Sequence, residues 1–455
     1  MTARTTLYPG KPKSPVSTLT APIDDDDTTI PVSELANFDA GPNEASIFLS
    51  PNDPETETIK YTDKSAASGA GNLTGVTRAF DSTTAKSWGT GAYIARVLTA
   101  YDYNGLVDNQ NLIFDEMPSI PLYRQALING NFDVWQRGTS LDSTTTPANS
   151  DDTYLADRWI LLSDGNDIVD VSRESTTFPE GSTYALKAEV ETANKKFGIC
   201  QILESVDATK FAGKTVSLSF QAHTPTGSVV ENLRAAVISW DGTADTVTSD
   251  VVSAWGNEGT NPTLATNWTY ENTPTDLALV ADTFTTFKIE GISIDTSGMT
   301  NLAVFIWVDD TDCAVDDVLR IAQVQLCEGD VALPFQPKSY DTELKDCQRY
   351  FERKFPEVAN GFICPGMVIS TTTAYGFFSY AMKRVPPTIS FSSGAGFYIR
   401  ESSTLVRTTN MASGTVLSTT AGIIIATCSE GLISNQAAYI RTNADTDFID
   451  ADAEL

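Results

Sequence analysis

The stretch ALINGNFDVWQRGTS at residues 126–140, with YLADRW at 154–159, marks where the central fold of this chain begins. Downstream of it, VSLSFQA (216–222) places apolar side chains on one face and Ser, Ser and Gln on the other, as in a half-buried strand. LRAAVISW (233–240) is apolar on both sides after Arg234, and LAVFIWV (302–308) is apolar throughout, which indicates interior strands. Antiparallel strands with turn signals between them predict a β-sandwich or jelly roll over residues 123–338.

Two further segments complete the predicted sandwich. FKIEGISID (287–295) changes phase at Gly291, the residue type that permits a β-bulge. LRIAQVQL (319–326) is the predicted last strand of the domain.

The flanking regions predict smaller elements. TTIPV after Asp24–Asp27, ETIKYT (57–62) and Tyr93–Leu98 are predicted strands of an N-terminal β domain. Residues 101–122 form a predicted extended connector, because proline at 118 and 121 restricts the backbone.

One helix is predicted, over residues 339–355. Leu344, Cys347 and Phe351 fall on one helical face, and Asp341 is the predicted N-cap. The expected fold class is therefore mainly β and multi-domain. Its parts are an N-terminal domain with arm and connector (1–122), a central sandwich (123–338), a linker helix (339–355) and a C-terminal β domain (356–455).

The bulk composition excludes several kinds of partner. The 455 residues carry a formal charge of −29, with a pI near 4.2, so the surface should repel nucleic-acid phosphates and anionic lipids. No apolar run approaches the roughly 20 residues needed to span a bilayer. The first residues lack the apolar core of a secretory signal, so synthesis and assembly in a cytoplasm are expected.

Catalytic signals are sparse. The six cysteines form no C-x-x-C pair, and we expect reduced, mostly buried thiols. The single histidine, His223, lies at a strand end and is expected to be structural. Glycoside hydrolysis needs a pair of carboxylates, but with 59 acidic residues the sequence offers too many pairs for any one of them to be informative. The sequence contains no phosphate-binding glycine loop. We therefore expect no enzymatic activity.

Residues 126–327 resemble carbohydrate-binding-module-like sandwiches whose first strand reads N-G-x-F-(D/E) followed by Trp. Asn129, Gly130, Phe132, Asp133 and Trp135 match that pattern. The extension QRGT (136–139), the ADRW tetrad (156–159) and the segment EGDVALPFQPKSYDTELKDCQRYF (328–351) are similar to the version found in bacteriophage virion proteins. We call residues 126–140 with 154–159 the opening motif, and residues 328–351 the closing motif.

The N-terminal segment is similar to a small β domain of phage tail and baseplate proteins. Glu57–Thr62, Leu73–Arg78 and Thr83–Ala85 match its pattern, whereas Ala79 replaces a usual Gly and Trp88 a frequent His. In that family the domain is an attachment or adaptor piece, so the resemblance implies assembly.

The resemblance also raises the question of calcium. In the sugar-binding relatives, the acidic residue at the position of Asp133 helps to hold a structural Ca²⁺, with an acidic pair in the last strand that residues 322–326 lack. Asp309, Asp310 and Asp312 offer further oxygen ligands. The alternative, which we favour, is a solvated acidic turn; apart from calcium, no cofactor is expected.

The tryptophans fall into two groups. Trp135, Trp159, Trp240 and Trp307 sit in strand patterns and are predicted core residues. Trp255, Trp268 and Tyr270 lie in the long polar segment 241–276. For these three rings we consider contact with a neighbouring subunit first, a small satellite core second and sugar binding third.

Taken together, the resemblances imply a bacteriophage virion structural protein, a tail fibre or tail-attached appendage acting in assembly and host-surface attachment. Its expected partners are other virion proteins through the N-terminal domain, two further copies in a homotrimer, and a host-surface glycan or protein. The expected location is the virion, assembled in the bacterial host cytoplasm. A head fibre or capsid decoration protein, and a glycan-degrading tail enzyme, are the alternatives.

Overall fold

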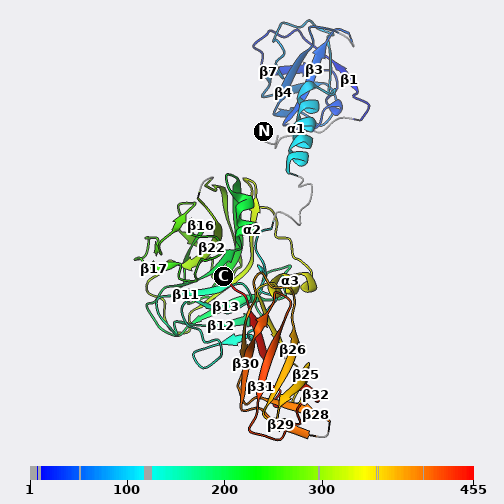
Figure 1. Cartoon of the computed structure of the whole chain (residues 1–455). Helices are drawn as coiled ribbons and strands as arrows, with labels where there is room; N and C mark the ends of the chain where they lie inside the picture. The colour runs from blue at the N-terminus through cyan, green and yellow to red at the C-terminus, as the bar shows by residue number, and fades with distance from the viewer. Residues whose placement is uncertain are drawn as a thin grey trace. The chain divides into compact units, whose positions relative to one another are not determined.

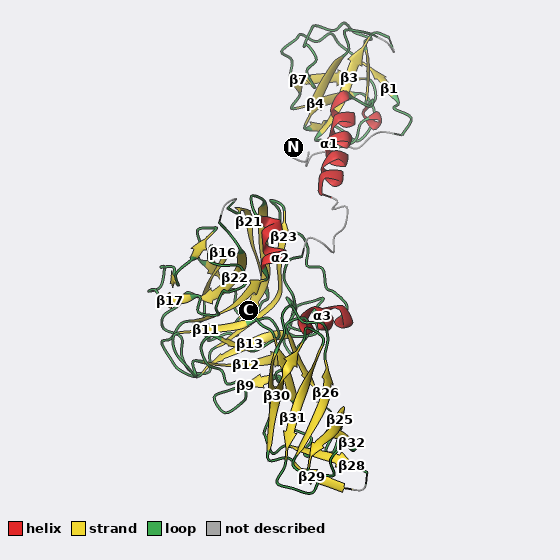
Figure 2. Ribbon diagram, viewed as in Figure 1, coloured by secondary structure: helices red, strands yellow, loops and turns green. Residues whose placement is uncertain are grey.

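The chain folds as separate β-rich parts. The computed structural model describes residue 8 and residues 12–50, 53–116, 125–295, 298–354, 356, 358–402 and 404–455. Two compact units, Met1–Ser119 and Ile120–Leu455, divide the chain, and antiparallel sheets dominate both (Figures 1 and 2). The prediction of a mainly β, multi-domain protein is confirmed. The predicted boundary at residues 122/123 lies outside the described residues.

The first unit packs a five-stranded sheet, in the order β1-β8-β3-β4-β7, and a three-stranded sheet, β2-β6-β5, around one core. Ile59 and Tyr61, predicted to face inward, are fully buried. The elements are β1 (Val16–Thr18), β2 (Thr29–Val32), η1 (Leu35–Asn37), β3 (Asn43–Phe48), β4 (Glu57–Tyr61), β5 (Asp63–Lys64), β6 (Gly71–Thr74), β7 (Thr77–Phe80) and β8 (Tyr93–Ala95).

The predicted extended connector is wrong over residues 101–116, which lie in helix α1 (Ala100–Glu116). The backbone N–H of Asp102 donates to Thr99 Oγ1 (3.3 Å), and the backbone N–H of Thr99 donates to the Asp102 carboxylate (3.2 Å). This reciprocal pair caps the first turn and starts the helix. The prolines at 118 and 121 lie outside the described residues.

A buried ion cluster ties the start of α1 to the first sheet. Arg96, 3% exposed, contacts Asp102 Oδ2 at 2.8 Å and Glu44 Oε1 at 3.1 Å, and Thr99 Oγ1 donates to Glu44 (2.8 Å). Burial raises the pKa of Glu44 to about 7, although Thr99 and Arg96 act in the opposite direction. One guanidinium thus serves two carboxylates in a water-poor site.

This cluster predicts a pH dependence of the first unit. Because the folded state holds the Glu44 proton more tightly than the unfolded chain does, the unit should lose on the order of 1–3 kcal/mol of stability between pH of about 4.5 and 7. Glu44→Gln should flatten that dependence in scanning calorimetry, whereas Glu55→Gln, at an exposed ion pair with Lys86, should preserve it. An identical pH response in wild type and Glu44→Gln would contradict the assignment.

The second unit begins with an antiparallel sandwich, as predicted. One sheet has the order β10-β11-β14-β22-β16-β19, with β20 also paired to β16, and the other has the order β21-β15-β23-β13-β12-β9. The strands are β9 (Ser140–Leu141), β10 (Thr153–Tyr154), β11 (Ile160–Ser163), β12 (Val169–Glu174), β13 (Ala185–Val190), β14 (Phe197–Leu203), β15 (Thr215–His223), β16 (Asn232–Trp240), β17 (Val252–Ala254), β18 (Thr263–Leu264), β19 (Trp268–Tyr270), β20 (Leu277–Ala278), β21 (Thr285–Ser293), β22 (Asn301–Val308) and β23 (Val318–Glu328). The helical turns α2 (Ser205–Ala208) and η3 (Thr209–Phe211) follow β14.

The sequence patterns of these strands are confirmed in detail. Residues 302–308 of β22 are completely buried, because apolar clusters cover both faces of their sheet. The β15–β21 register shifts between the pairs Val216↔Ile292 and Leu218↔Ile289, which leaves one extra residue on β21. Gly291 there has φ +71°, so it forms the predicted bulge.

The C-terminal domain follows a short helix. Helix α3 spans Tyr340–Gln348, so the predicted helix 339–355 is too long, and Phe351 lies in a strand instead. Ser339, not Asp341, is the N-cap, and its side chain accepts from the backbone N–H of Thr342. Just after the helix, the Arg349 carbonyl accepts a hydrogen bond from the backbone N–H of Arg384 (3.1 Å).

Two sheets form this domain, in the orders β24-β33-β27 and β29-β28-β32-β25-β26-β31-β30. In the three-stranded sheet, the strand directly after α3 pairs with a strand about 100 residues later, so the beginning and the end of the domain lie side by side. The strands are β24 (Phe351–Lys354), β25 (Phe362–Ser370), β26 (Thr373–Ser379), β27 (Thr388–Phe391), β28 (Phe397–Glu401), β29 (Thr404–Arg407), β30 (Asn410–Leu417), β31 (Ala421–Thr427), β32 (Ala437–Thr442) and β33 (Ile449–Asp452).

Among the described residues, every helix is too short or too polar to cross a membrane. All six cysteines are buried free thiols, as predicted.

Candidate functional site

The opening motif builds a tight loop against the sandwich. Asn129, in the left-handed region, donates from Nδ2 to the carbonyls of Val134 (2.9 Å) and Asp157 (3.0 Å), and its Oδ1 accepts from the Val134 N–H (3.0 Å). Trp159 Nε1 donates to the Asn129 carbonyl (3.0 Å). The motif residue Asn129 therefore satisfies buried backbone groups that would otherwise lack partners.

The arginines of the same motif reach the C-terminal domain. Arg137 and Arg158 are 5% and 1% exposed, and both pair with Glu454, whose side chain is 6% exposed. Arg137 Nη2 lies 3.3 Å from Glu454 Oε1, and Arg158 Nη1 contacts Glu454 Oε2. Glu454 thus pairs with two arginines that lie about 300 residues earlier in the chain, and Asp157 and Asp452 add negative charge beside Arg137.

Aromatic rings of the closing motif complete this cluster. The Arg158 guanidinium lies 3.6 Å from the ring centre of Tyr350, and the Arg137 guanidinium lies 3.6 Å from that of Phe351. We call Arg137, Asp157, Arg158, Tyr350, Phe351 and Glu454 the joint. It brings the opening motif, the closing motif and the segment after the last strand together at one buried place.

Hydrogen bonds hold the joint in register. Asp157 accepts from the backbone N–H (2.6 Å) and side-chain amide (2.7 Å) of Gln136, whose Nε2 also donates to the Phe351 carbonyl (2.9 Å). Burial raises the pKa of Asp157 to about 6, while Arg137 and Gln136 act to lower it. Arg384 donates to the carbonyls of Ala453 (2.6 Å) and Glu454 (2.9 Å). The arrangement fixes the C-terminal domain on the sandwich.

A second buried carboxylate organises the motif of the first unit. Glu57, fully buried, accepts from Arg78 Nε (2.7 Å), from Trp88 Nε1 (2.8 Å) and from the Ala79 backbone N–H (3.2 Å). Burial alone would raise the pKa of Glu57, but these hydrogen bonds outweigh it and lower the pKa. Ala79 has φ +53°, a backbone conformation that glycine adopts more readily than alanine, and Trp88 supplies an N–H donor to the carboxylate.

The predicted calcium ligands do not converge. Asp309 pairs with Arg234 Nε (2.8 Å) and Lys196 Nζ (3.3 Å), and Asp310 accepts from the backbone N–H groups of Glu231 (2.7 Å) and Asn232 (2.8 Å). Asp312 is exposed, and Asp133 bonds Asn131 in the opening motif. Within the described ranges, no three His, Cys, Asp or Glu side chains are grouped to hold a metal ion. The structure therefore does not bring the four carboxylates together as one ligand set, and ion pairs and backbone N–H groups already contact Asp309 and Asp310.

For the three rings in segment 241–276, the structure shows the second of the three alternatives, a small satellite core. Trp268 is 6% exposed and packs edge-on against Trp240, with ring centres 5.4 Å apart. Trp255 and Tyr270 are partly buried against the same cluster, which covers the outer face of the β11-β14-β22-β16 sheet. Tyr270 donates its hydroxyl to the Pro262 carbonyl (2.8 Å). The segment folds back over the sheet as a satellite core.

This burial predicts that Trp268 contributes mainly to stability. Trp268→Ala should lower the free energy of unfolding by about 3 kcal/mol, because it opens a cavity beside Trp240. Trp255→Ala, at a partly buried ring, should cost clearly less. Urea unfolding followed by far-ultraviolet circular dichroism measures both. An unchanged midpoint for Trp268→Ala would mean that the ring does not act as core.

His223 is a structural residue. It is 6% exposed, its ring lies 4.9 Å from that of Phe284, and its Nδ1 lies 3.4 Å from Arg320. Burial, followed by the neighbouring Arg320 charge, lowers its pKa. This environment stabilises a neutral imidazole in the sandwich.

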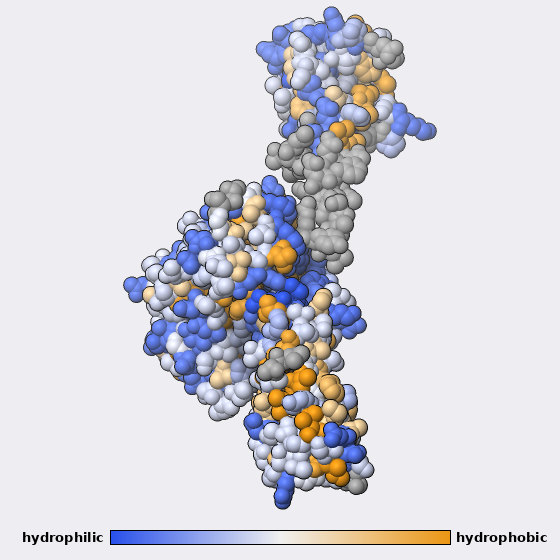
Figure 3. Space-filling view, viewed as in Figure 1, coloured by the Kyte–Doolittle hydropathy of each residue, from blue (hydrophilic) through white to orange (hydrophobic). Residues whose placement is uncertain are grey.

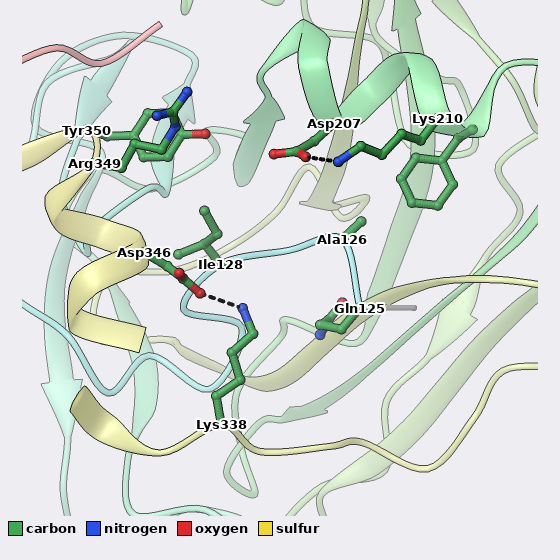
Figure 4. Close-up of a pocket in the computed structure, with 10 residues that line it drawn as sticks. Gln125, Ala126, Ile128, Asp207, Lys210, Lys338, Asp346, Arg349 and Tyr350 are labelled. Carbon is green, nitrogen blue, oxygen red and sulfur yellow. Dashed lines mark hydrogen bonds and ion pairs between the residues drawn. The ribbon is translucent and has the colours of Figure 1, made fainter. Parts of the chain in front are cut away.

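A pocket of about 240 Å³ lies where α3 faces the turn after β14 (Figure 4). Its cations are paired: Lys210 with Asp207 (2.5 Å), Lys338 with Asp346 (2.9 Å), and Arg349 with Glu204 (2.8 Å). Sequence reasoning did not find this pocket, because its walls come from distant segments. Its paired charges make it a structural cleft beside the joint.

Comparison with known proteins gives similarities of fold. The chain is similar to the enzymatically active domain of tailspike protein 4 of bacteriophage CBA120 (12% identity, TM-score 0.28, 46% of this chain and 22% of that one). It is also similar to the carbohydrate-binding module TmCBM61 in complex with beta-1,4-galactotriose (12%, 0.27, 45% and 99%). A third is the CBM22-1 xylan-binding domain from Paenibacillus barcinonensis Xyn10C (13%, 0.26, 40% and 94%). No protein-family model and no curated protein sequence matches the chain. At these TM-scores the similarities assign no function to this chain.

Proposed function

We propose that this chain is a structural protein of a bacteriophage particle, a tail fibre or tail-attached appendage that acts by binding. The observation that carries the proposal is the joint. Gln136, Arg137 and Arg158 belong to the parts of the opening motif that resemble the virion version of the sandwich, and they contact Phe351, Tyr350 and Glu454. The residues that distinguish the virion version from a plain sugar-binding module are thus the ones that attach a further β domain.

The first unit would act as the attachment piece. Glu57 and Arg78, which match the pattern of the phage adaptor domain, contact each other at a buried carboxylate, and this contact supports the resemblance. Trp88, which departs from the pattern, donates to the same carboxylate. In this proposal the unit docks to other virion proteins, three copies assemble, and the second unit meets the host surface. Repeated copies would raise the avidity of individually weak contacts.

Labelling of phage particles tests the proposal. Antibodies against this chain, applied to particles grown on the bacterial host and viewed by electron microscopy, should mark the tail. Labelling at the capsid would favour a head fibre or decoration protein, and absence of label on intact and opened particles would refute a virion role. Release of reducing sugar from host polysaccharide by the purified chain would favour the glycan-degrading alternative.

Glycan recognition by the sandwich is a second candidate function. Trp255 remains partly exposed in the segment that folds back over the sheet containing β22. The centre of its ring lies 6.0 Å from that of Phe305. Exposed ring faces can stack on sugars. The full chain and its Trp255→Ala variant should then differ in binding to isolated host glycans. Equal binding would exclude this ring as a contact.

A further inference from the structure

Four strands of the C-terminal domain, β25, β32, β28 and β29, lie side by side and carry arginines and aromatic rings on their outer face (Figure 1). Their inner face packs on a buried cluster that includes Phe397, Ile399 and Ile440. The residues that alternate with these are more exposed and point outward. We define the arginine face by its outward residues: Phe362, Tyr398, Arg400, Arg407, Tyr439 and Arg441.

The strand register places guanidinium groups beside rings. Arg407 on β29 pairs with Tyr398 on β28, which in turn pairs with Arg441 on β32. Arg441 also pairs with Phe362 on β25. The Arg441 guanidinium lies 5.5 Å from the centre of the Tyr398 ring. Charged and aromatic side chains therefore alternate across four adjacent strands, and Figure 3 shows hydrophobic residues next to strongly hydrophilic ones on the visible surface of this domain.

Arg400 brings the three arginines into one group. It pairs with Leu405 on β29 and with Tyr439 on β32. It is therefore the diagonal neighbour of Arg407 on one side and of Arg441 on the other, and such neighbours lie about 7–8 Å apart. Like charges at this distance repel one another, so their grouping costs free energy in the free chain. An anion placed among them removes that cost.

The arginine face supplies no anion of its own. Among the described residues, none of its three arginines pairs with a carboxylate: Arg407 Nε donates to the neutral carbonyl of Ala395 (2.9 Å), and Arg441 Nε is shielded from solvent without any acceptor. Glu401, the one acidic residue of these four strands, points into the core and is 1% exposed. Arg78, by contrast, lies 2.7 Å from a glutamate carboxylate. In a chain with 59 acidic and 30 basic residues, three unpaired arginines on one face indicate an anion supplied by a ligand.

The rings of the face are open to solvent. Phe362 is 61% exposed and Tyr439 36%, and their ring centres lie 5.9 Å apart. Exposed rings can stack on the apolar faces of sugars, and guanidinium groups bind carboxylates through paired N–H donors. A nucleic acid also combines rings with charge, but it carries a phosphate on every residue, so the formal charge of −29 opposes it more strongly.

We infer that the arginine face binds an acidic polysaccharide, a sugar polymer that carries carboxylate groups. This inference rests on the proposed binding function of the second unit at the host surface, and it names the ligand class and the site. Arg400 and Arg441 donate to the carboxylates, and Phe362 and Tyr439 stack on the sugar rings. The site is separate from Trp255 in the sandwich, so variants distinguish the two.

Biolayer interferometry of the full chain on immobilised polygalacturonate tests the inference. Wild type should bind this polymer, and it should bind the methyl ester, which keeps the sugar chain but lacks the charges, at least tenfold more weakly. Arg400→Gln and Arg441→Gln should each weaken binding at least fivefold. Arg173→Gln is the matched control and should bind as wild type does, because Arg173 also lies over a tyrosine ring, 4.2 Å from the centre of Tyr184, but on the sandwich.

Phe362→Ala tests the stacking contact and should weaken binding at least threefold while the preference for the charged polymer remains. Circular dichroism checks that each variant is folded. The inference would be overturned by a wild type that binds none of polygalacturonate, hyaluronate and alginate, or by arginine variants that bind like wild type. Equal binding of a single-stranded oligonucleotide would overturn it as well, because the face would then recognise anions without sugar. Tail labelling tests the virion role independently, so that role would survive the loss of this site.

Discussion

Replacing Arg158 by Met is expected to lower the free energy of unfolding of the second unit by about 3–5 kcal/mol. Methionine retains much of the packing on Tyr350 but removes the charge beside Glu454, whose side chain is 6% exposed. Arg137, at 3.3 Å, then remains as the close cation of that carboxylate within the joint. A buried carboxylate that loses one of its two arginine partners destabilises the fold far more than an exposed carboxylate that loses a partner.

Urea unfolding with tryptophan fluorescence reports this change, because six of the seven tryptophans lie in the second unit. Lys214→Met is the matched control. It breaks the exposed Lys214–Glu328 pair, whose side chains are each 45% exposed, and should cost under about 1 kcal/mol. The double variant Arg158→Met with Glu454→Gln should recover part of the loss. Equal destabilisation by Arg158→Met and Lys214→Met would show that the joint contributes little.

Gly130→Ala is expected to destabilise the sandwich by about 3 kcal/mol, although it adds a single methyl group. A Cβ at this position would lie 2.1 Å from the Val324 carbonyl oxygen. That atom belongs to the backbone of β23, whose Val324 N–H donates to the Gly130 carbonyl at 2.8 Å. Neither chain segment can move without breaking this contact, so the strand and the opening motif must separate.

Gly89→Ala provides the comparison, because a Cβ there meets no atom within 4 Å. It should leave calorimetric transitions within about 0.5 kcal/mol of wild type. Should Gly130→Ala prove equally harmless, the close approach of the opening motif to β23 would not limit stability.

The sequence predicted those features that depend on local pattern. The apolar run 302–308, the bulge at Gly291 and the strands around Ile59 follow from alternation and glycine chemistry, and the structure confirms them. Helix α1 was not predicted, because the prolines at 118 and 121 indicated an extended connector over the whole segment. The residues that cap the helix, Thr99 and Asp102, lie at its other end.

The joint could not be predicted in the same way. Arg158 and Glu454 are 296 residues apart, and nothing in the sequence separates Glu454 from the neighbouring acidic residues Asp450 and Asp452. Trp268 was misjudged for a related reason, since a polar segment gave no indication that it folds back onto Trp240. Contacts that are distant in sequence decide both cases.

The pairing of β24 with β33 orders events during synthesis. Residues 351–354 are synthesised about 100 residues before their partners at 449–452, which corresponds to roughly 5–20 s at ordinary rates of protein synthesis. Until then Arg137 and Arg158 have no Glu454, and β24 has an open edge. A chain that stops before residue 449 can neither close that sheet nor pair those arginines with Glu454, so incomplete copies are expected to be unstable.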